Sequence, residues 1–374
     1  MVQDLALQRN KYKHLSDEEW RWFLQQVEGR ERTADKLPTF AAIDDWWYPV
    51  RLSCEQCSSE ATARYKASLC QSEGRSLLDL TGGYGVDTYF LSEHFNHTDY
   101  VEQNAELCRI ATHNFAAKPI TIHHSIAEDF LASAGQYDLI FLDPARRDSY
   151  GGKVFKLADC TPNVVELLPT LLSRLAPDGR IMLKLSPMID LTQAFKELSA
   201  VKWDAHIVAV KNEVKEVLLL SGGSGQITAI DLSKKEQVFT FTREEEQATQ
   251  TKMVNGTWSN GTWIYEPNAA ILKAGAYKIV AQRFGLQKLD TNTHLYTSET
   301  LVPDFPGRVW KVKEPTPTRP KGKEIKQANV LVRNYPLTAE QLKKKLHLRD
   351  GGTAYVIGCR VAGKPTVFLA ERLQ

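Results

Sequence analysis

The chain has 374 residues, of which 43% are hydrophobic and 25% charged, and its formal net charge is +2. A chain of this length is too long for one compact core, so we expect two or three domains. The charged N-terminus excludes a signal peptide, and no apolar run approaches the ~18 residues that a membrane span needs. Six cysteines in a chain of this size give no disulfide framework, which indicates a protein of the reducing cytoplasm.

Residues 1–70 are predicted to be a helical leader. The stretch "SDEEWRWFLQQV" is typical of a capped helix start, because a serine precedes an acidic first turn. This segment shows no alternation of apolar and polar residues of the kind that would indicate a strand.

Residues 71–225 alternate between strand and helix patterns. Seven strands are expected, namely "SLLDLT", "TDYVEQ", "ITIHHS", "YDLIFLDP", "RIMLKLSP", "HIVAVKN" and "VKEVLLLSG", and helical patterns separate the first five. This strict alternation of strand and helix predicts a doubly wound parallel sheet. Only a few residues around 212–214 join the last two strands, so these must be antiparallel, because a parallel crossover needs a dozen residues or more. The expected fold is therefore α/β, a parallel sheet that ends in an antiparallel hairpin.

The remainder divides into two further segments. Residues 226–306 begin with a predicted hairpin, "ITAIDL" and "QVFTFT", and continue with two Asn-Gly turn signals, a helix near 268–275 and short strands. Residues 307–374 begin with a basic arm, since 311–326 contain three prolines and six basic residues and are typical of an extended linker. A small α+β module of strand, helix, strand, turn and strand follows.

Charge is distributed unevenly along the chain. Residues 308–374 carry 15 Lys/Arg against 5 Asp/Glu, a net charge of +10, and the first 307 residues have a net charge of −8. A basic tail on an acidic body indicates a polyanionic partner, most economically nucleic acid. The alternative is a lysine-rich solvated surface.

The stretch "LLDLTGGYGVDTYFL" at 77–91 places a glycine-rich turn between a strand and a helix. It lacks the lysine of a nucleoside triphosphate loop, and Thr88 stands where a dinucleotide fingerprint has its third glycine. Asp79 before the turn and Asp87 after it would repel a pyrophosphate, but they suit a ligand with an ammonium and a sulfonium group. That ligand is S-adenosylmethionine.

The turn resembles motif I of the Rossmann-like class I methyltransferases, acid-x-G-x-G-x-G, with Thr81 in place of the first glycine. The matching residues are Asp79, Thr81, Gly83 and Gly85, with Gly82 inside the same turn. The resemblance implies that Gly83 and Gly85 let the backbone approach the methionine moiety. It also implies that Asp79 faces the amino end of that moiety, directly or through water.

Two further places are expected to bind the cofactor. Glu102 ends the next strand in "VEQN", at the spacing where such folds bind ribose hydroxyls, and Gln103 follows it. In this type of family an acid after the third strand often binds the adenine amine. Ile126 stands at that position here, so the ring would pack on Ile126 and the amine would meet Glu128, Asp129 or the backbone.

The fourth strand ends in "LDPARRD", where this architecture places its catalytic residues. Asp143 and Pro144 resemble the start of the (Asp/Asn)-Pro-Pro-aromatic motif of amino-group methyltransferases, but Ala145 and Arg146 depart from it. The resemblance implies that Asp143 holds an exocyclic amine of a base. Arg146 would stack by its guanidinium plane, and Arg146 or Arg147 would bind phosphate. The alternative is an aspartate that caps the next helix.

Other polar residues are weaker candidates. Lys184 and Ser186 at the end of the fifth strand, and Lys211 at the end of the sixth, should face the same cleft as substrate contacts. Cys54 and Cys57 form a C-x-x-C pair without a second pair, so we predict no metal site.

The chain as a whole resembles the bacterial class I methyltransferase-like proteins with a C-terminal THUMP-like domain. The matching stretches are "EQCSSEATARYKASL", "LLDLTGGYGVD", "VEQN", "LDPARR", "FPGRVWKV" and "VLVRNYPLTAEQLKKKLHLRDGGTAYVIG". The resemblance implies a small ferredoxin-like segment near 262–306, followed by a THUMP-like module of a kind that binds RNA elsewhere. The basic residues Lys321, Lys323, Lys343 and Lys344 would then contact the substrate.

The expected function is S-adenosylmethionine-dependent methylation of a base of rRNA or tRNA. Two alternatives are a methyltransferase acting on a small molecule or a protein, and a non-catalytic RNA-binding protein that retains the fold. In the first of these three interpretations, residues 308–374 dock RNA for the catalytic cleft.

Overall fold

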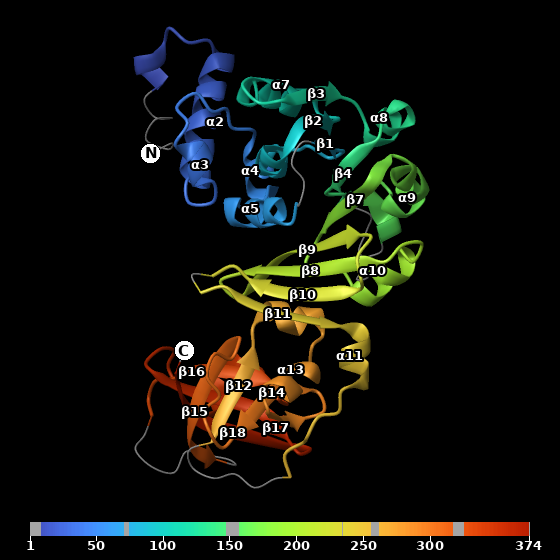
Figure 1. The fold of residues 1–374 in the computed structure, drawn as a ribbon. Coiled ribbons are helices and arrows are strands. Elements are labelled where there is room, and N and C mark those ends of the chain that lie inside the picture. The colour runs from blue at the N-terminus through green and yellow to red at the C-terminus, as the bar shows by residue number, and fades with distance from the viewer. Residues whose placement is uncertain are drawn as a thin grey trace. The chain divides into compact units, whose positions relative to one another are not determined.

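A computed structural model of the chain describes residues 9–70, 75–146, 157–233, 235–255, 262–316 and 325–373, and the side chains of 146 and 314–316 are outside this description. The chain divides into two compact units (Figure 1). The first comprises residues 1–203 and 217–224, and the second comprises residues 204–216 and 225–374. The predicted division into segments 1–70, 71–225, 226–306 and 307–374 stays a prediction.

Four α-helices open the described part of the first unit: α2 (Asp17–Thr33), α3 (Pro38–Ala41), α4 (Arg51–Gln56) and α5 (Glu60–Ser68), after the 3-10 turn η1 (Arg9–Tyr12). Ser16 caps α2 in a capping box with Glu19, as the acidic first turn predicts. Aromatic residues of this segment, including Phe40 and Trp46, are buried in one cluster with Tyr84, Phe90 and Tyr100. The helical leader therefore packs on the glycine-rich turn and forms part of the same core.

The sheet of the first unit contains five parallel strands. These are β1 (Arg75–Asp79), β2 (Phe95–Glu102), β3 (Ile120–His124), β4 (Tyr137–Leu142) and β7 (Leu175–Leu185). They lie in the order β7-β4-β1-β2-β3, and β9 (Glu213–Ser221) pairs with β7 in the antiparallel direction. The strand order reverses between β1 and β4, so the carboxyl ends of these strands form the crevice where open α/β sheets bind ligands.

Helices connect these strands, as the alternating pattern predicts. They are α6 (Val86–Leu91), α7 (Ala105–Asn114), α8 (Ala127–Ser133), α9 (Val164–Ser173) and α10 (Leu191–Glu197), with the 3-10 turns η2 (Ser92–His94) and η3 (Leu157–Asp159). A small two-stranded ladder joins β5 (Ala145–Arg146) to β6 (Cys160–Thr161). Figure 1 shows these helices flanking the strands of the first unit.

A two-residue turn at Lys211 and Asn212 links β8 (Trp203–Val210) to β9, and both residues have the left-handed backbone that such a hairpin turn needs. The prediction of a parallel sheet closed by an antiparallel hairpin is confirmed. In the second unit, β10 (Gln226–Asp231) runs parallel to β8, and β11 (Gln237–Thr242) forms the predicted hairpin with β10.

The rest of the second unit contains a seven-stranded sheet in the order β13-β14-β12-β15-β18-β17-β16. Its strands are β12 (Trp263–Pro267), β13 (Gln287–Asp290), β14 (Thr293–Ser298), β15 (Gly307–Thr316), β16 (Asn329–Arg333), β17 (Ala354–Val361) and β18 (Lys364–Arg372). The helices of this unit are α11 (Arg243–Ala248), α12 (Ala269–Ala274), α13 (Ile279–Arg283) and α14 (Ala339–Lys345).

The strands on either side of residue 307 share one sheet and one core. β12 pairs with β15 along Gly307–Lys311, and Trp310 and Ile264 are buried in the same cluster as Ile357 and Phe368. Buried Glu266 accepts hydrogen bonds from Arg308 and Arg333. Cutting the chain at 307 would therefore expose this core.

The predicted arm at 311–326 is wrong over its first part. Residues 311–316 belong to strand β15 and pair with β18. Pro315 lies beyond Lys311, the last residue of β15 that also pairs with β12. A strand that pairs on one side tolerates proline, because no neighbour needs its missing N–H. The middle of the predicted arm, 317–324, lies outside the described residues.

Candidate functional site

A cavity of about 580 Å³ lies in the first unit, at the carboxyl ends of β1, β2 and β4. The turn 79–87, Glu102, Gln103, residues 125–128, Asp143, Ala145, Thr161, Pro162 and Lys184 line it. The leader adds Ser53, Gln56, Cys57 and Ser58. The structure thus brings together the predicted cofactor residues and Asp143 in one cavity.

Two glycines of the turn are required by its surroundings. A Cβ on Gly82 would lie 2.1 Å from the ring of Tyr100, and a ring buried in a close-packed core cannot move aside for it. Gly85 has φ +80°, a backbone conformation that favours glycine, and a Cβ there would lie 2.5 Å from Phe115. The hydroxyl of Tyr100 donates a hydrogen bond to the Gly83 carbonyl at 2.5 Å. The turn is therefore held close to β2. Because its glycines have no side chains, its backbone lies directly against the cavity.

Asp79 is almost completely buried at the end of β1. Its carboxylate accepts hydrogen bonds from the Thr88 hydroxyl (2.5 Å) and the Thr81 N–H (2.9 Å). Burial raises the pKa of Asp79 to about 7, because these hydrogen bonds only partly offset the loss of water. A carboxyl group in this state is suited to a cationic ligand, which would favour its ionised form.

Glu102 is half-buried at the end of β2. Its two oxygens accept hydrogen bonds from the Gly83 N–H and the Asn104 N–H, each at 2.8 Å. The carboxylate therefore faces the glycine turn, as the spacing from Asp79 predicts. Gln103 follows in the same cavity wall, and its carbonyl is 3.0 Å from Nε2 of His124.

Ile126 and Glu128 also line the cavity, beyond the end of β3. Ile126 is 44% exposed, which is high for a large apolar residue at a cavity wall. Asp129 is not among the lining residues. The position where the family often has an acid therefore offers an apolar surface in this chain, with Glu128 beside it.

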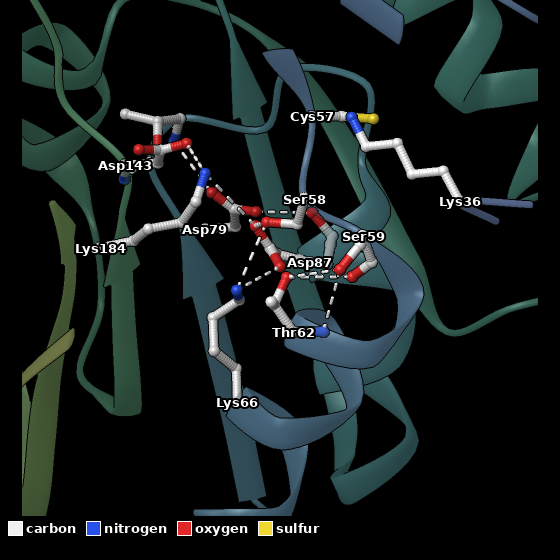
Figure 2. A network of polar contacts seen from close by, with 12 residues as sticks. Lys36, Cys57, Ser58, Ser59, Thr62, Lys66, Asp79, Asp87, Asp143 and Lys184 are labelled. Carbon is white, nitrogen blue, oxygen red and sulfur yellow. Dashed lines mark hydrogen bonds and ion pairs between the residues drawn. The ribbon is translucent and has the colours of Figure 1, made fainter. Parts of the chain in front are cut away.

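Asp87 is buried under the turn and is held by the leader (Figure 2). The Ser58 hydroxyl donates to it at 2.7 Å, and Nζ of Lys66, a fully buried lysine of α5, is 3.2 Å from its other oxygen. Burial opposes the charge of Asp87, but Lys66 and Lys184 hold its pKa below the usual value. Sequence reasoning missed Ser58 and Lys66 as site residues; the stretch "EQCSSEATARYK" that carries them was matched only as part of the family resemblance.

Asp143 follows β4 directly and is partly exposed in the cavity. Nζ of Lys184, from the end of β7, contacts its Oδ2 and lies 3.9 Å from Oδ2 of Asp87 (Figure 2). The backbone N–H of Asp143 donates to the Thr81 hydroxyl at 2.7 Å. The helix-cap alternative is wrong, because Asp143 and Pro144 lead into strand β5.

Several predicted substrate residues do not line the cavity or lie outside the described residues. Ser186 does not line the cavity. Lys211 is not among the lining residues either; it belongs to the second unit, where its backbone forms the β8–β9 turn, and its substrate contact stays a prediction. The backbone of Arg146 pairs with Cys160, but its side chain and Arg147 lie outside the described residues, as do Lys321 and Lys323.

Lys343 and Lys344 lie on α14 of the second unit. Lys343 is already paired with Glu340 (2.8 Å) and Asp350 (2.7 Å), whereas Lys344 is exposed.

Metal and membrane sites find no support in the part of the chain that the structure describes. No group of His, Cys, Asp or Glu residues there could hold a metal ion, and Cys54 and Cys57 are free thiols. None of the helices described is long and apolar enough to cross a bilayer.

Comparisons with known proteins agree with this geometry. Residues 263–306 match a ferredoxin-like domain, and residues 307–372 match a THUMP-like domain. The crystal structure of a candidate methyltransferase from Porphyromonas gingivalis W83 superposes with a TM-score of 0.85 at 33% identity, over 96% of this chain and 92% of that one. An uncharacterized S-adenosylmethionine-dependent methyltransferase of Mycobacterium tuberculosis is 23% identical over 91% of this chain and 92% of its own length. The chain belongs to the S-adenosylmethionine-dependent methyltransferases.

The cofactor of this methyltransferase is S-adenosylmethionine, as the acid-flanked turn predicts. The cavity fits a cation. Among the described lining residues are five acids, Asp79, Asp87, Glu102, Glu128 and Asp143, against one basic residue, Lys184. Backbone approach at Gly83 and an apolar wall at Ile126 fit the rest of such a ligand. The predicted Rossmann-like α/β fold with C-terminal ferredoxin-like and THUMP-like modules is confirmed.

Proposed function

We propose that this methyltransferase methylates a nitrogen of a base in ribosomal or transfer RNA. The observation that carries the proposal is the association, in one chain, of an acceptor site built on Asp143-Pro144 with a strongly basic THUMP-like module. Modules of this kind bind RNA elsewhere, and a net charge of +10 over 308–374 favours a polyanion.

At the cofactor end, the carboxylate of Glu102 would bind both ribose hydroxyls, and Ile126 would pack on the adenine ring. Gly83 and Gly85 would let the turn approach the methionine moiety, and Asp79 would balance its ammonium group. Asp87 keeps the turn in place through Ser58 and Lys66. S-adenosylmethionine supplies an activated methyl group when it is bound.

At the acceptor end, the chain has to orient a nucleophile in line with that methyl group. Asp143 is a partly exposed acid of this crevice, and its backbone and one carboxylate oxygen are both held. A carboxylate fixed in this way can accept a hydrogen bond from an exocyclic amine and so aim its lone pair. Positioning and electrostatics of this kind supply most of the rate in an in-line displacement.

The module would dock RNA through exposed basic residues near the end of α14. We call Lys326, Lys344, Lys345 and Arg349 the basic cluster; all four are exposed. The Arg349 N–H donates to the Lys326 carbonyl at 2.9 Å, which brings the loop after α14 beside the segment before β16. Within the described ranges, Lys344 and Lys345 make no ion pair, unlike Lys343. Such lysines attract phosphates through their field, without base contacts.

The first test is transfer of a radiolabelled methyl group from S-adenosylmethionine. Total RNA, protein and metabolite fractions from cells that lack the enzyme would be offered separately. Label in ribosomal or transfer RNA is expected. Label only in protein or metabolites would contradict the RNA proposal in favour of the alternative substrates, and cofactor binding without transfer to any fraction would favour a non-catalytic RNA-binding protein.

The second test concerns docking. Removing residues 308–374 is unsuitable, because β15 shares its core with β12. The variant K344Q/K345Q should instead weaken binding of a transcribed ribosomal RNA in fluorescence anisotropy. The slope of log affinity against log salt should become shallower by about 0.7 for each single-strand phosphate that the variant no longer neutralises.

Lys364 offers a control for the loss of an exposed positive charge elsewhere on the module. It is exposed and begins β18, so it lies at the far end of β17 from Ala354 and the basic cluster. The eight residues of β17 separate the two ends by roughly 23 Å. K364Q should leave the salt slope unchanged, and all variants should bind S-adenosylmethionine as the wild type does. Equal weakening by both variants would contradict docking at the basic cluster.

A further inference from the structure

We propose that Lys184 is a positioning residue that presents Asp143 to a neutral acceptor nitrogen and disfavours a protonated amine. The inference deepens the proposed function, on which it rests for the acceptor class. It makes Lys184 a determinant of substrate chemistry, instead of the direct substrate contact that the sequence suggests.

Register alone brings Lys184 and Asp143 together. β4 and β7 are parallel neighbours with Leu142 opposite Leu183, so the next residues along, Asp143 and Lys184, stand opposite one another. The side chain of Lys184 is only 12% exposed, whereas that of Asp143 is 39% exposed. The lysine therefore reaches the acid from the more buried side and leaves the other side of the carboxylate toward the cavity, which both residues line. Figure 2 shows the end of the Lys184 side chain directed at the Asp143 carboxylate.

Asp143 is held from two directions. Thr81 accepts a hydrogen bond from its backbone N–H, and Lys184 engages Oδ2. Among the residues that the structure describes, the hydrogen bond and the ion pair of the carboxylate both involve Oδ2. This arrangement leaves Oδ1 as the oxygen to accept a hydrogen bond from a substrate, and it fixes the direction in which that bond is accepted.

Lys184 also carries a charge in a poorly solvated place. It lies between Asp143 and Asp87, and Asp87 is paired on its other side with Lys66. The result is a row of alternating charges, Lys66, Asp87, Lys184 and Asp143, from helix α5 to the acceptor site. In a site of low dielectric constant, an ammonium group repels a second cation by several times more than it would in water.

The acceptor chemistry follows from this charge. In the transfer, the acceptor nitrogen gives its electron pair to the methyl carbon, the carbon–sulfur bond breaks with its pair going to sulfur, and the nitrogen releases one proton to solvent. A protonated alkylamine has no free pair, and near Lys184 it would also meet a like charge. A neutral aromatic amine of a nucleobase keeps its electron pair and carries no positive charge, and it can donate one hydrogen bond to Oδ1.

Calorimetry with two cofactor analogues tests the charge effect without any acceptor. S-adenosylhomocysteine is neutral at sulfur, whereas sinefungin carries an ammonium group on the carbon that replaces the methylated sulfur. In the full-length protein, K184M should shift the ratio of the two dissociation constants toward sinefungin by about tenfold or more. K184R keeps the charge and should keep the wild-type ratio. The exposed Lys196 on α10 serves as control, and K196M should also behave as wild type.

The ratio separates a charge effect from a packing effect. Circular dichroism would verify that each variant is folded, and K184Q would replace K184M if the latter does not fold. An unchanged ratio in folded K184M or K184Q would overturn the inference, as would a K184R ratio equal to that of K184M.

A transfer assay tests the acceptor class directly. Transcribed ribosomal RNA and poly-L-lysine would be offered to wild type and K184M. Wild type should label RNA and not poly-L-lysine, and K184M should raise the label in poly-L-lysine relative to RNA at least about tenfold. Preferential labelling of poly-L-lysine by wild type would overturn the inference. If RNA is not labelled at all, the proposed function fails, and the analogue ratio still decides the role of Lys184.

Discussion

The hydroxyl of Thr81 accepts a hydrogen bond from the backbone N–H of Asp143 at 2.7 Å. Thr81 stands where motif I of related enzymes has its first glycine, so the departure from the motif has a visible consequence. It ties the cofactor turn to the segment after β4. A glycine at this position could not make this contact.

Replacing Thr81 with valine should therefore slow methyl transfer more than it weakens cofactor binding. Valine keeps the shape but leaves the Asp143 N–H without its acceptor, at a cost of about 1–2 kcal/mol or roughly tenfold in rate. T81S retains the hydroxyl and should be close to wild type. Single-turnover transfer measures the rate and calorimetry the affinity. A T81V enzyme as fast as T81S would show that the contact has no part in positioning Asp143.

Variants of Asp143 and Glu102 should have different effects: one should slow methyl transfer, and the other should weaken cofactor binding. D143A should lower the rate of methyl transfer at least about a hundredfold, because the acceptor loses its orienting group, and should leave the affinity for S-adenosylhomocysteine, which is neutral at sulfur, within about twofold. E102A should weaken cofactor binding clearly, since its carboxylate faces Gly83. Calorimetry and radiolabel transfer on both variants measure the two effects. A D143A enzyme with wild-type turnover would remove Asp143 from the mechanism.

The affinity for S-adenosylmethionine should rise with pH. Burial raises the pKa of Asp79 to about 7; Asp87 and Asp143, which face it, also raise this pKa, while Thr88 and Thr81 oppose the rise through hydrogen bonds. A cation binds the ionised carboxylate better, so between about pH 6 and pH 8 affinity should increase by up to about tenfold. D79N should lose that part of the dependence and report the titration of the ligand alone. Parallel pH profiles for the two proteins would contradict the assignment.

The same residue should make the unliganded protein less stable at higher pH. In the folded state Asp79 binds its proton up to about pH 7, whereas in the unfolded chain it releases it near pH 3.8. The folded state therefore binds more protons in this window, and its contribution to the free energy of unfolding falls by about 2–4 kcal/mol as pH rises. Asp87, whose pKa is lowered, stays ionised throughout. Urea titrations of wild type and D79N at about pH 5 and pH 8 measure the difference. From about pH 5 to pH 8 the free energy of unfolding of wild type should fall further, or rise less, than that of D79N, and the opposite order would contradict the sign argued here.

Local pattern was sufficient for most of the fold. Alternating strand and helix signals predict β1, β2, β3, β4 and β7, and the short link at Lys211 and Asn212 requires the antiparallel end. The exception is 311–316, where prolines suggest an arm. The stretch is a strand because β18, much later in the chain, supplies a partner on one side only. The local composition does not encode a pairing between strands so far apart in the sequence.

The site divides in the same way. Asp79, Glu102 and Asp143 stand at strand ends, and in a parallel sheet all carboxyl ends meet at one edge, so the sequence predicts their proximity. The position of strand ends could not identify Lys66 as a residue of the site. A lysine on a short helix ordinarily indicates a solvated face, and its burial depends on Asp87, which belongs to a different helix. Lys211 also stands at the end of a predicted strand, but it belongs to the second unit and its backbone forms the turn to β9, so its part in the site stays a prediction.

Lys66 gives the last prediction, because its side chain is fully buried against Asp87. Replacing it with methionine keeps the volume but leaves a buried carboxylate without its main counter-charge, which typically costs about 3–5 kcal/mol. The K66M protein should therefore unfold at lower urea concentration and bind S-adenosylmethionine more weakly, since Asp87 anchors the glycine turn. The double variant K66M/D87N removes both charges and should recover a large part of the stability. R51M, which breaks the exposed Arg51–Glu55 pair on neighbouring α4, should leave the unfolding midpoint unchanged. If K66M/D87N is as unstable as the sum of the single variants, the two residues are not coupled, and the leader is attached to the turn by its aromatic packing alone.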